Sequence, residues 1–137
     1  MHTALCDVLG IATPEMRVSP LWKRMIVEAG PGDAVQAALL DLLLPPYNRP
    51  HHPALGRVLR TPFLEEWSGR PGELAGHAAE LIPALIRDVL AGGGHERVPF
   101  AGQSVGLIHQ VRPAGDIVQE TVREATDIFQ RCRRSGQ

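Results

Sequence analysis

The chain has 137 residues, enough for one domain with a single core and too few for two. Its formal net charge is −1, and acidic and basic residues are interspersed in both halves. Nothing therefore marks a surface for nucleic acid or an anionic membrane. The N-terminal residues lack the pattern of a secretory signal, and no apolar run approaches the ~20 residues that span a bilayer. We expect a cytoplasmic protein.

The two cysteines, Cys6 and Cys132, lie near opposite ends of the sequence, and neither is in a CxxC motif. A disulfide that ties the termini together is one interpretation. We favour the other, in which both are buried small hydrophobic residues on terminal helices, because the composition is typical of a cytosolic chain.

Helix signals recur along the chain, and strand signals are almost absent. The first element in chain order is a short predicted helix over residues 3–9. Ser19 is then a typical N-cap residue, with Pro20 at the first helical position. This pair predicts an amphipathic helix that stops at Gly30.

Asp33 is expected to cap a second helix over residues 34–44. The apolar residues of this helix cover most of its circumference, which predicts heavy burial. Residues 45–62 hold five of the twelve prolines and predict an extended, rigid connector. The nearest candidate for a strand is RVPF, residues 97–100.

Thr61 and Pro62 repeat the signal of a cap followed by proline, and they predict a helix of one or two turns. A longer helix begins at Pro71 and ends at the three glycines 92–94. Pro83 should kink this helix or split it in two, since proline removes a backbone donor.

The last helix is the clearest prediction. It begins at Pro113, and the arginines in its last turn and Asp116 in its first suit the helix dipole. Its apolar face carries Ala114, Ile117, Val118, Val122, Ala125, Ile128, Phe129 and Cys132. No heptad seam is long enough for a coiled coil. The predicted fold is mostly α, with five or six helices and a proline-rich connector.

Six histidines suggest a metal ion, and His51–His52 is the most suggestive pair. Adjacent histidines do not match zinc-ligand spacing, and no CxxC or HExxH motif accompanies them. We assign no metal site and no catalytic residue. His77 falls on the apolar side of its helix, where a hydrogen-bonded core histidine is favoured. Glu65 and Glu66 are better explained as solvated charges than as an acid and a base.

The loop VPFAGQSVGLIHQVRPAG spans residues 98–115. It is neither a Walker A motif, which ends in Gly-Lys-Ser/Thr, nor a GxGxxG fingerprint after a strand. Gly102 and Gly106 permit close backbone approach to a ligand, and the helix start at Pro113 favours an anion. From the residues alone, we favour a packed connector over a ligand-binding loop.

Two stretches, FLEEWSGRPGEL and PFAGQSVGLIHQVRPAGDIVQETVREA, resemble the C-terminal part of the nitronate monooxygenase family, formerly called 2-nitropropane dioxygenases. ATPEMRVSPLWKRMIVEAG and LLPPYNRPHHP are similar to the segment that precedes it in that family. The resemblance covers residues 12–137, and its most specific piece is AGQSVGLI.

The resemblance implies an FMN-dependent (β/α)8 barrel enzyme. Such enzymes oxidise alkyl nitronates with dioxygen to a carbonyl compound and nitrite, and a histidine serves as the base. In the family the AGQ segment lies against the flavin, so the resemblance implies Gly102, Gln103 and Ser104 as cofactor-binding residues. No histidine of this chain matches the family's base.

The sequence departs from the family in its middle. Residues 1–11, MHTALCDVLGI, resemble the short helix that begins these proteins, and the chain then passes directly into ATPE, which resembles the segment after the barrel strands. The chain also lacks the eight buried, β-branched strands that a parallel barrel needs. The resemblance therefore implies an N-terminal helix at 1–11 and a helical C-terminal part at 12–137, without the barrel between them.

We expect a truncated or internally deleted family member that is inactive alone and binds no FMN by itself. The alternative is a small helical module that pairs with a protein partner or with itself through exposed apolar helix faces. The near-continuous apolar helix predicted at residues 34–44 motivates this alternative. A complete small enzyme of another class is disfavoured, because no nucleophile, metal or acid–base constellation is evident.

Overall fold

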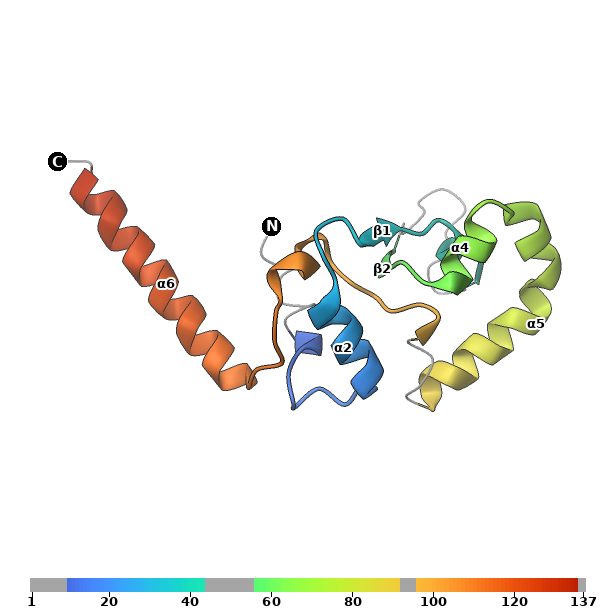
Figure 1. Ribbon diagram of the computed structural model, residues 1–137, viewed down its shortest axis with the longest axis horizontal. Helices are drawn as coiled ribbons and strands as arrows, with labels where there is room; N and C mark the ends of the chain where they lie inside the picture. The colour runs from blue at the N-terminus through green and yellow to red at the C-terminus, as the bar shows by residue number, and fades with distance from the viewer. Residues whose placement is uncertain (1–9, 44–55, 92–95, 136–137) are drawn as a thin grey trace.

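Figure 1 shows a computed structural model of the chain, which describes residues 10–43, 56–91 and 96–135. Most of the fold is a body from which one helix projects as an arm (Figure 1). In chain order the elements are α2 (Pro20–Glu28), β1 (Ala34–Gln36), α3 (Leu39–Leu43), β2 (Arg57–Leu59), α4 (Pro62–Ser68), α5 (Pro71–Leu90), the 3-10 helix η2 (Gln103–Leu107) and α6 (Ala114–Ser135). The prediction of a mostly helical fold is confirmed.

Parts of three predictions lie outside the described residues: the helix at 3–9, most of the connector at 45–62, and the glycines at 92–94. The proposed division after residue 11 stays a prediction. Ile11 and Ala12, on either side of it, are both buried in one hydrophobic cluster. None of the helices within residues 10–43, 56–91 and 96–135 combines the length and the hydropathy of a membrane span.

The starts of α2 and α4 follow the predicted capping chemistry. The Ser19 hydroxyl accepts a hydrogen bond from the Trp22 backbone N–H at 3.1 Å. The Thr61 hydroxyl accepts one from the Leu64 backbone N–H, also at 3.1 Å. A proline follows each cap at the first helical position. Both predictions are confirmed, because capping depends only on residues a few positions apart.

The helix predicted over residues 34–44 is wrong. Its first part is strand β1, and only the short helix α3 follows. β1 pairs antiparallel with β2, and Ala34 lies opposite Leu59. Pairing with a segment far along the chain overrides the local helical preference of an alanine- and leucine-rich run.

Asp33 closes a turn instead of capping a helix. Its carboxylate accepts a hydrogen bond from the Gly30 backbone N–H at 2.7 Å. Gly32, inside the turn, has a φ of 94°, a conformation that glycine adopts without steric cost. The turn directs the chain into β1.

The second edge of β2 pairs with the segment that precedes η2. Val58 and Phe100 form an isolated antiparallel bridge, which two backbone hydrogen bonds of 2.9 and 3.0 Å flank. Of the strand candidate at residues 97–100, only this last residue forms a bridge. Strand β2 is therefore paired on both edges.

Two hydrophobic clusters fill the body. The first joins α2, β1 and the η2 region through Trp22, Ile26, Ala34, Val105 and Ile108. The second joins β2, α3, α4 and α5 through Val58, Leu40, Leu64, Leu74 and Leu85. Phe100 packs against both clusters, and its carbonyl accepts a hydrogen bond from the Trp22 indole at 3.3 Å. The segment at Phe100 thus ties the two clusters together.

Helix α5 continues through Pro83 and is not split. Its ribbon bends along its length in Figure 1, as the loss of one backbone donor predicts. His77 is hydrogen-bonded, with Nδ1 3.0 Å from the Glu73 carbonyl oxygen. It is exposed, so its predicted place in the core is wrong. Its ring lies beside the ring of Trp67, with the centroids 5.5 Å apart.

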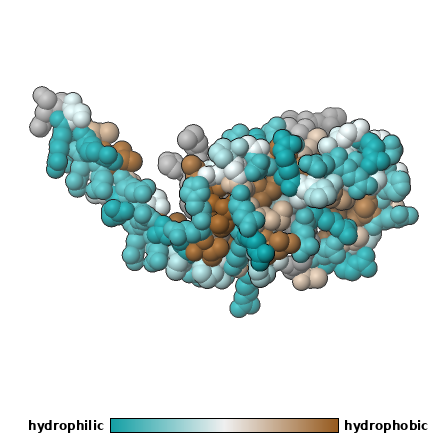
Figure 2. Space-filling view, viewed as in Figure 1, coloured by the Kyte–Doolittle hydropathy of each residue, from teal (hydrophilic) through white to brown (hydrophobic). Residues whose placement is uncertain are grey.

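Helix α6 has the predicted apolar face, but none of its residues is buried. Val118 is 62% exposed and Phe129 is 71% exposed. In Figure 2 hydrophobic residues show along one side of the arm. Cys132 is also exposed, so its predicted burial is wrong, because nothing in the described chain packs on that part of α6. Cys6 lies outside the described residues.

Replacing Thr61 by alanine should lower the free energy of unfolding by about 1–3 kcal/mol. The side chain caps α4 and also donates a 2.8 Å hydrogen bond to the Arg97 carbonyl, from a position that is 4% exposed. Urea unfolding measures the change. Thr61→Ser keeps the hydroxyl and should retain most of the stability. Unchanged stability in the alanine variant would contradict this role.

Candidate functional site

The loop that contains the predicted site is held against the body by η2. Val105, inside η2, is fully buried, and Ile108, just after it, is buried as well. Gly106 packs on the turn before β1: a Cβ at this position would lie 2.7 Å from the Pro31 backbone nitrogen. Only glycine fits such a close approach. This half of the loop is a packed connector, as the residues alone suggested.

The three predicted cofactor-binding residues lie at the start of η2. Gln103 is exposed, and Gly102 and Ser104 are half-buried. The Ser104 hydroxyl oxygen is itself buried and has no hydrogen-bond partner within the described part of the chain. Buried hydroxyl groups normally have a partner, so this atom offers an unmet hydrogen bond. The cofactor role of the three residues stays a prediction.

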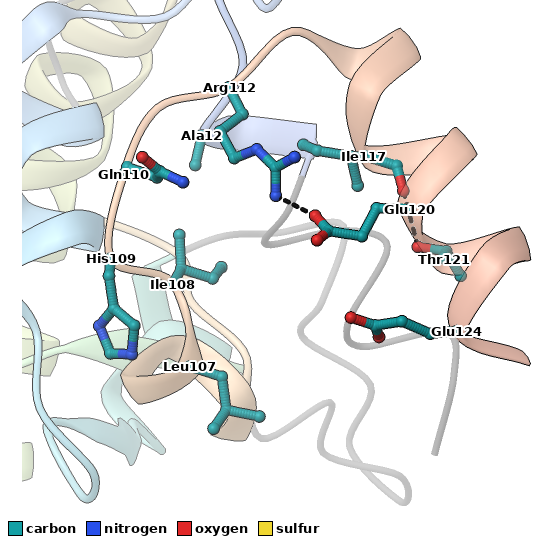
Figure 3. A pocket seen from close by; sticks show the side chains of 10 residues that line it. All are labelled: Ala12, Leu107, Ile108, His109, Gln110, Arg112, Ile117, Glu120, Thr121 and Glu124. Atoms are coloured by element: carbon teal, nitrogen blue, oxygen red, sulfur yellow. Dashed lines mark hydrogen bonds and ion pairs between the residues drawn. The ribbon is translucent and has the colours of Figure 1, made fainter. Parts of the chain in front are cut away.

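A hollow of about 350 Å³ lies between the end of this loop and α6 (Figure 3). The loop contributes one wall and the first part of α6 the other. Its lining consists of Ala12, Leu107, Ile108, His109, Gln110, Arg112, Ile117, Glu120, Thr121 and Glu124. We call this hollow the arm groove.

An ion pair crosses the arm groove. Arg112 from the loop and Glu120 from α6 point toward each other (Figure 3) and form a hydrogen-bonded salt bridge. Arg123, one turn along, also lies 3.3 Å from the Glu120 carboxylate. The hydrogen bond from Arg112 lowers the pKa of Glu120 below its usual value, and the same bond raises the pKa of Arg112. Both groups are therefore charged at neutral pH.

Two further backbone N–H groups, those of Ala114 and Arg112, fix the start of α6. The Glu15 carboxylate accepts hydrogen bonds from the Ala114 backbone N–H, at 3.1 and 3.2 Å to its two oxygens. The Arg112 backbone N–H donates to the Ala12 carbonyl at 3.1 Å. An anion at a helix N-terminus is favourable. The arm is thus attached at its base by residues 12–15 and by the ion pair.

The arm groove has the chemistry of an attachment rather than of a catalytic site. The lowered pKa of Glu120 makes its carboxylate a poor proton acceptor at neutral pH. His109 lines the groove and is exposed. In the described residues, no three His, Cys, Asp or Glu side chains are grouped to hold a metal ion; His51 and His52 lie outside them.

Glu65 and Glu66 are both exposed, as solvated charges are. Glu66 lies 3.6 Å from the Arg70 guanidinium in a surface ion pair. Glu65 lines a second hollow of about 350 Å³ beside α4, together with Arg60. Glu66 does not line it, so this hollow does not receive the two carboxylates together.

Sequence reasoning missed Arg112, Glu120 and Glu15. Arg112 and Glu120 are eight residues apart, on either side of the bend at Pro113, and Glu15 is 99 residues from Ala114. No short-range pattern marks such contacts. The available hint was the predicted helix start at Pro113, because a helix N-terminus attracts a carboxylate.

Replacing Glu120 by glutamine should remove a pH-dependent part of the stability. Because the pKa of Glu120 is lowered on folding, its ion pair stabilises the protein above the ordinary value of 4.5. That contribution is lost as the pH falls through the lowered value. Thermal unfolding measured from neutral to acidic pH should show this loss in the wild type and a smaller one in Glu120→Gln, by no more than a few degrees because the pair is partly exposed.

Glu124→Gln is the matched control. It removes the same charge one turn along α6 and leaves the hydrogen bond between Arg112 and Glu120 in place. An equal change of the pH profile in both variants would mean that overall charge, and not this ion pair, causes the effect.

Comparison with known proteins gives a structural match and no sequence-family match. No family model and no curated protein matches the chain. FabK from Thermotoga maritima matches it with 31% sequence identity and a TM-score of 0.66. A point mutant of the same FabK matches with 28% identity and a TM-score of 0.59.

The match is nearly complete for this chain and partial for FabK. It covers 90% of this chain in both comparisons, but only 36% of FabK and 33% of the mutant. The chain therefore spans about a third of the protein that it resembles. The helical fold and the resemblance noted from AGQSVGLI and its neighbours agree with this match. The chain is similar in structure and sequence to about a third of FabK, and its own sequence resembles the nitronate monooxygenase family.

Proposed function

We propose that this chain is a truncated or internally deleted member of the nitronate monooxygenase family, in which an N-terminal helix at residues 1–11 joins the C-terminal helical part of an FMN-dependent oxidoreductase at residues 12–137. We further propose that it neither binds FMN nor oxidises nitronates on its own. The observation that carries the proposal is the match to FabK, which covers 90% of this chain and 36% of FabK. The family oxidises alkyl nitronates with dioxygen to a carbonyl compound and nitrite, and we assign that reaction to whole enzymes only.

The described residues do not fit a complete FMN site. Beside Gly102 and Gln103, Ser104 offers one hydroxyl group that has no hydrogen-bond partner among the described residues. These three residues would form only part of one wall of an FMN site. None of the three lines either of the two hollows, the arm groove or the one beside α4. A flavin needs a concave, largely preformed cavity with donors for its phosphate. We therefore derive no chemical step through FMN for this chain.

Titration of FMN with the purified full-length chain tests this proposal. We expect no saturable quenching of flavin fluorescence at micromolar chain concentrations, and no nitrite from an alkyl nitronate in air. A cooperative urea transition of the same sample shows that the chain is folded. Micromolar binding together with nitrite release would overturn the proposal.

If quenching does occur, two variants identify which residues bind the flavin. Ser104→Ala removes the unmet hydroxyl group, and binding at the predicted residues should then weaken. Gln110→Ala is the matched control, since Gln110 is exposed and lines the arm groove instead. Equal loss in both variants would place the flavin away from the residues that the resemblance implies.

A second candidate function is protein interaction, and the exposure of α6 favours it. The broadly apolar helix expected at residues 34–44 does not support this function, because Leu39, Leu40 and Leu43 of α3 are buried in the body. The exposed apolar surface is on α6 instead, where Val118, Val122, Ile128 and Phe129 are each more than half exposed. A cytoplasmic location, and the lack of nucleic-acid and membrane partners, stay predictions from the sequence.

A further inference from the structure

One whole side of α6 carries no charge. At the 3.6-residue repeat of an α-helix, this side holds Ala114, Ile117, Val118, Thr121, Val122, Ala125, Ile128, Phe129, Cys132 and Ser135. All of its aliphatic and aromatic members except Ile117 and Ala114 are exposed. We call this side the α6 stripe. A surface helix normally turns such a stripe toward a core, and here the described body does not cover it.

The spacing of the stripe suits another helix. Val118, Val122, Ala125, Phe129 and Cys132 follow one another at alternating intervals of four and three residues. This is the pattern of a two-helix seam. The seam covers only about two heptads, so pairing through it should be weak and dependent on concentration.

The charges on the other side of α6 favour a second copy of the same helix. They balance, with four carboxylates and four arginines: Asp116, Glu120, Glu124 and Asp127, and Arg123, Arg131, Arg133 and Arg134. All the carboxylates precede Ile128, and three of the arginines follow it. Two such helices side by side in opposite directions place acidic segments beside basic ones, and they oppose their dipoles. Parallel helices would bring like charges together.

The shape of the molecule favours the same arrangement. The arm leaves the body at its N-terminal end, and its C-terminal end lies far from the body (Figure 1). In an antiparallel pair the two bodies would sit at opposite ends of a helix about 33 Å long. In a parallel pair they would compete for the same space. A lipid surface fits less well, since a membrane-binding helix is usually rich in cationic side chains and α6 has no net charge.

We propose that the α6 stripe binds the α6 stripe of a second copy of this chain, with the two helices antiparallel and crossing near Ala125. The small Ala125 side chain lies midway between Val118 and Cys132 and allows close approach of the helices. The proposal names the partner for the interaction function proposed above and rests on it.

Sedimentation of the full-length chain over a range of concentrations tests the pairing. We expect a monomer–dimer equilibrium, and Phe129→Glu should weaken it about tenfold or more, because it places a charge in the apolar seam. Gln130→Glu introduces the same charge on the neighbouring, polar side of α6 and should leave the equilibrium nearly unchanged. A chain that is monomeric throughout, or a dimer that Phe129→Glu does not weaken, overturns the proposal.

Cross-linking tests whether the two α6 helices are antiparallel. In a chain with Cys6→Ser, two Cys132 side chains would lie roughly 20 Å apart along an antiparallel pair, beyond the reach of a short bismaleimide. Adding Cys132→Ser and Ala125→Cys moves the thiol to the crossing point, where the reagent should link the two copies. Linkage at Cys132 would show a parallel pair, in which each residue lies beside its own copy, and would overturn the proposal.

Binding of an apolar fluorescent dye shows whether only the pairing proposal fails or the interaction function fails with it. If the chain is monomeric but binds the dye, and Phe129→Glu reduces that binding, the α6 stripe is open and takes another partner. In that case the interaction function stands and the second copy is excluded. If the monomer binds no dye, the stripe is already covered and both proposals fail.

Discussion

The body depends on the pairing of strand β2 with a neighbouring segment on each of its two edges. The strand lies between β1 and the segment at Phe100, and its central residue, Val58, bridges to both and is fully buried. These pairings bring together three segments that are far apart in the sequence. They also join the two hydrophobic clusters, since Phe100 packs against each of them. The positions of α2, of the α3–α5 group and of η2 all depend on this small sheet.

The same constraint explains which parts of the fold could be predicted. The caps at Ser19 and Thr61 are local, because each involves a backbone donor only three residues away, and sequence reasoning found both. The failure at residues 34–44 is non-local. Alanine and leucine favour a helix in isolation, but the hydrogen bonds available from β2 decide the conformation. No feature of that short stretch reveals a partner so far along the chain.

The candidate site divides in the same way. Gly102, Gln103 and Ser104 are contiguous, so a family resemblance was enough to name them, and the structure adds one fact, the unmet hydrogen bond of the buried Ser104 hydroxyl. The pair of Arg112 and Glu120 depends on the bend between the loop and α6, and sequence spacing did not indicate it. The direction of the arm, which decides whether its apolar side is covered, is equally a tertiary property.

The similarity to about a third of FabK gives these features a common explanation. Under the proposed function, the chain keeps its own core and lacks the rest of the enzyme that would cover its remaining apolar surface. The two hydrophobic clusters form the core of the body. The α6 stripe, by contrast, is apolar surface without a partner in the described chain. The Ser104 hydroxyl likewise has no hydrogen-bond partner there. Function should therefore be sought in what this chain binds.

Hydrogen exchange of the full-length chain at high dilution tests this account most directly. The account predicts slow exchange for the amides of β2 and for the buried turns of α5, and protection of only the first turns of α6, near Glu15 and Arg112. The amides of α6 beyond Glu124 should exchange orders of magnitude faster than those of β2. Equal protection along all of α6 and in β2 in the dilute monomer would contradict the account, because it would show that the arm is already packed against the rest of the chain.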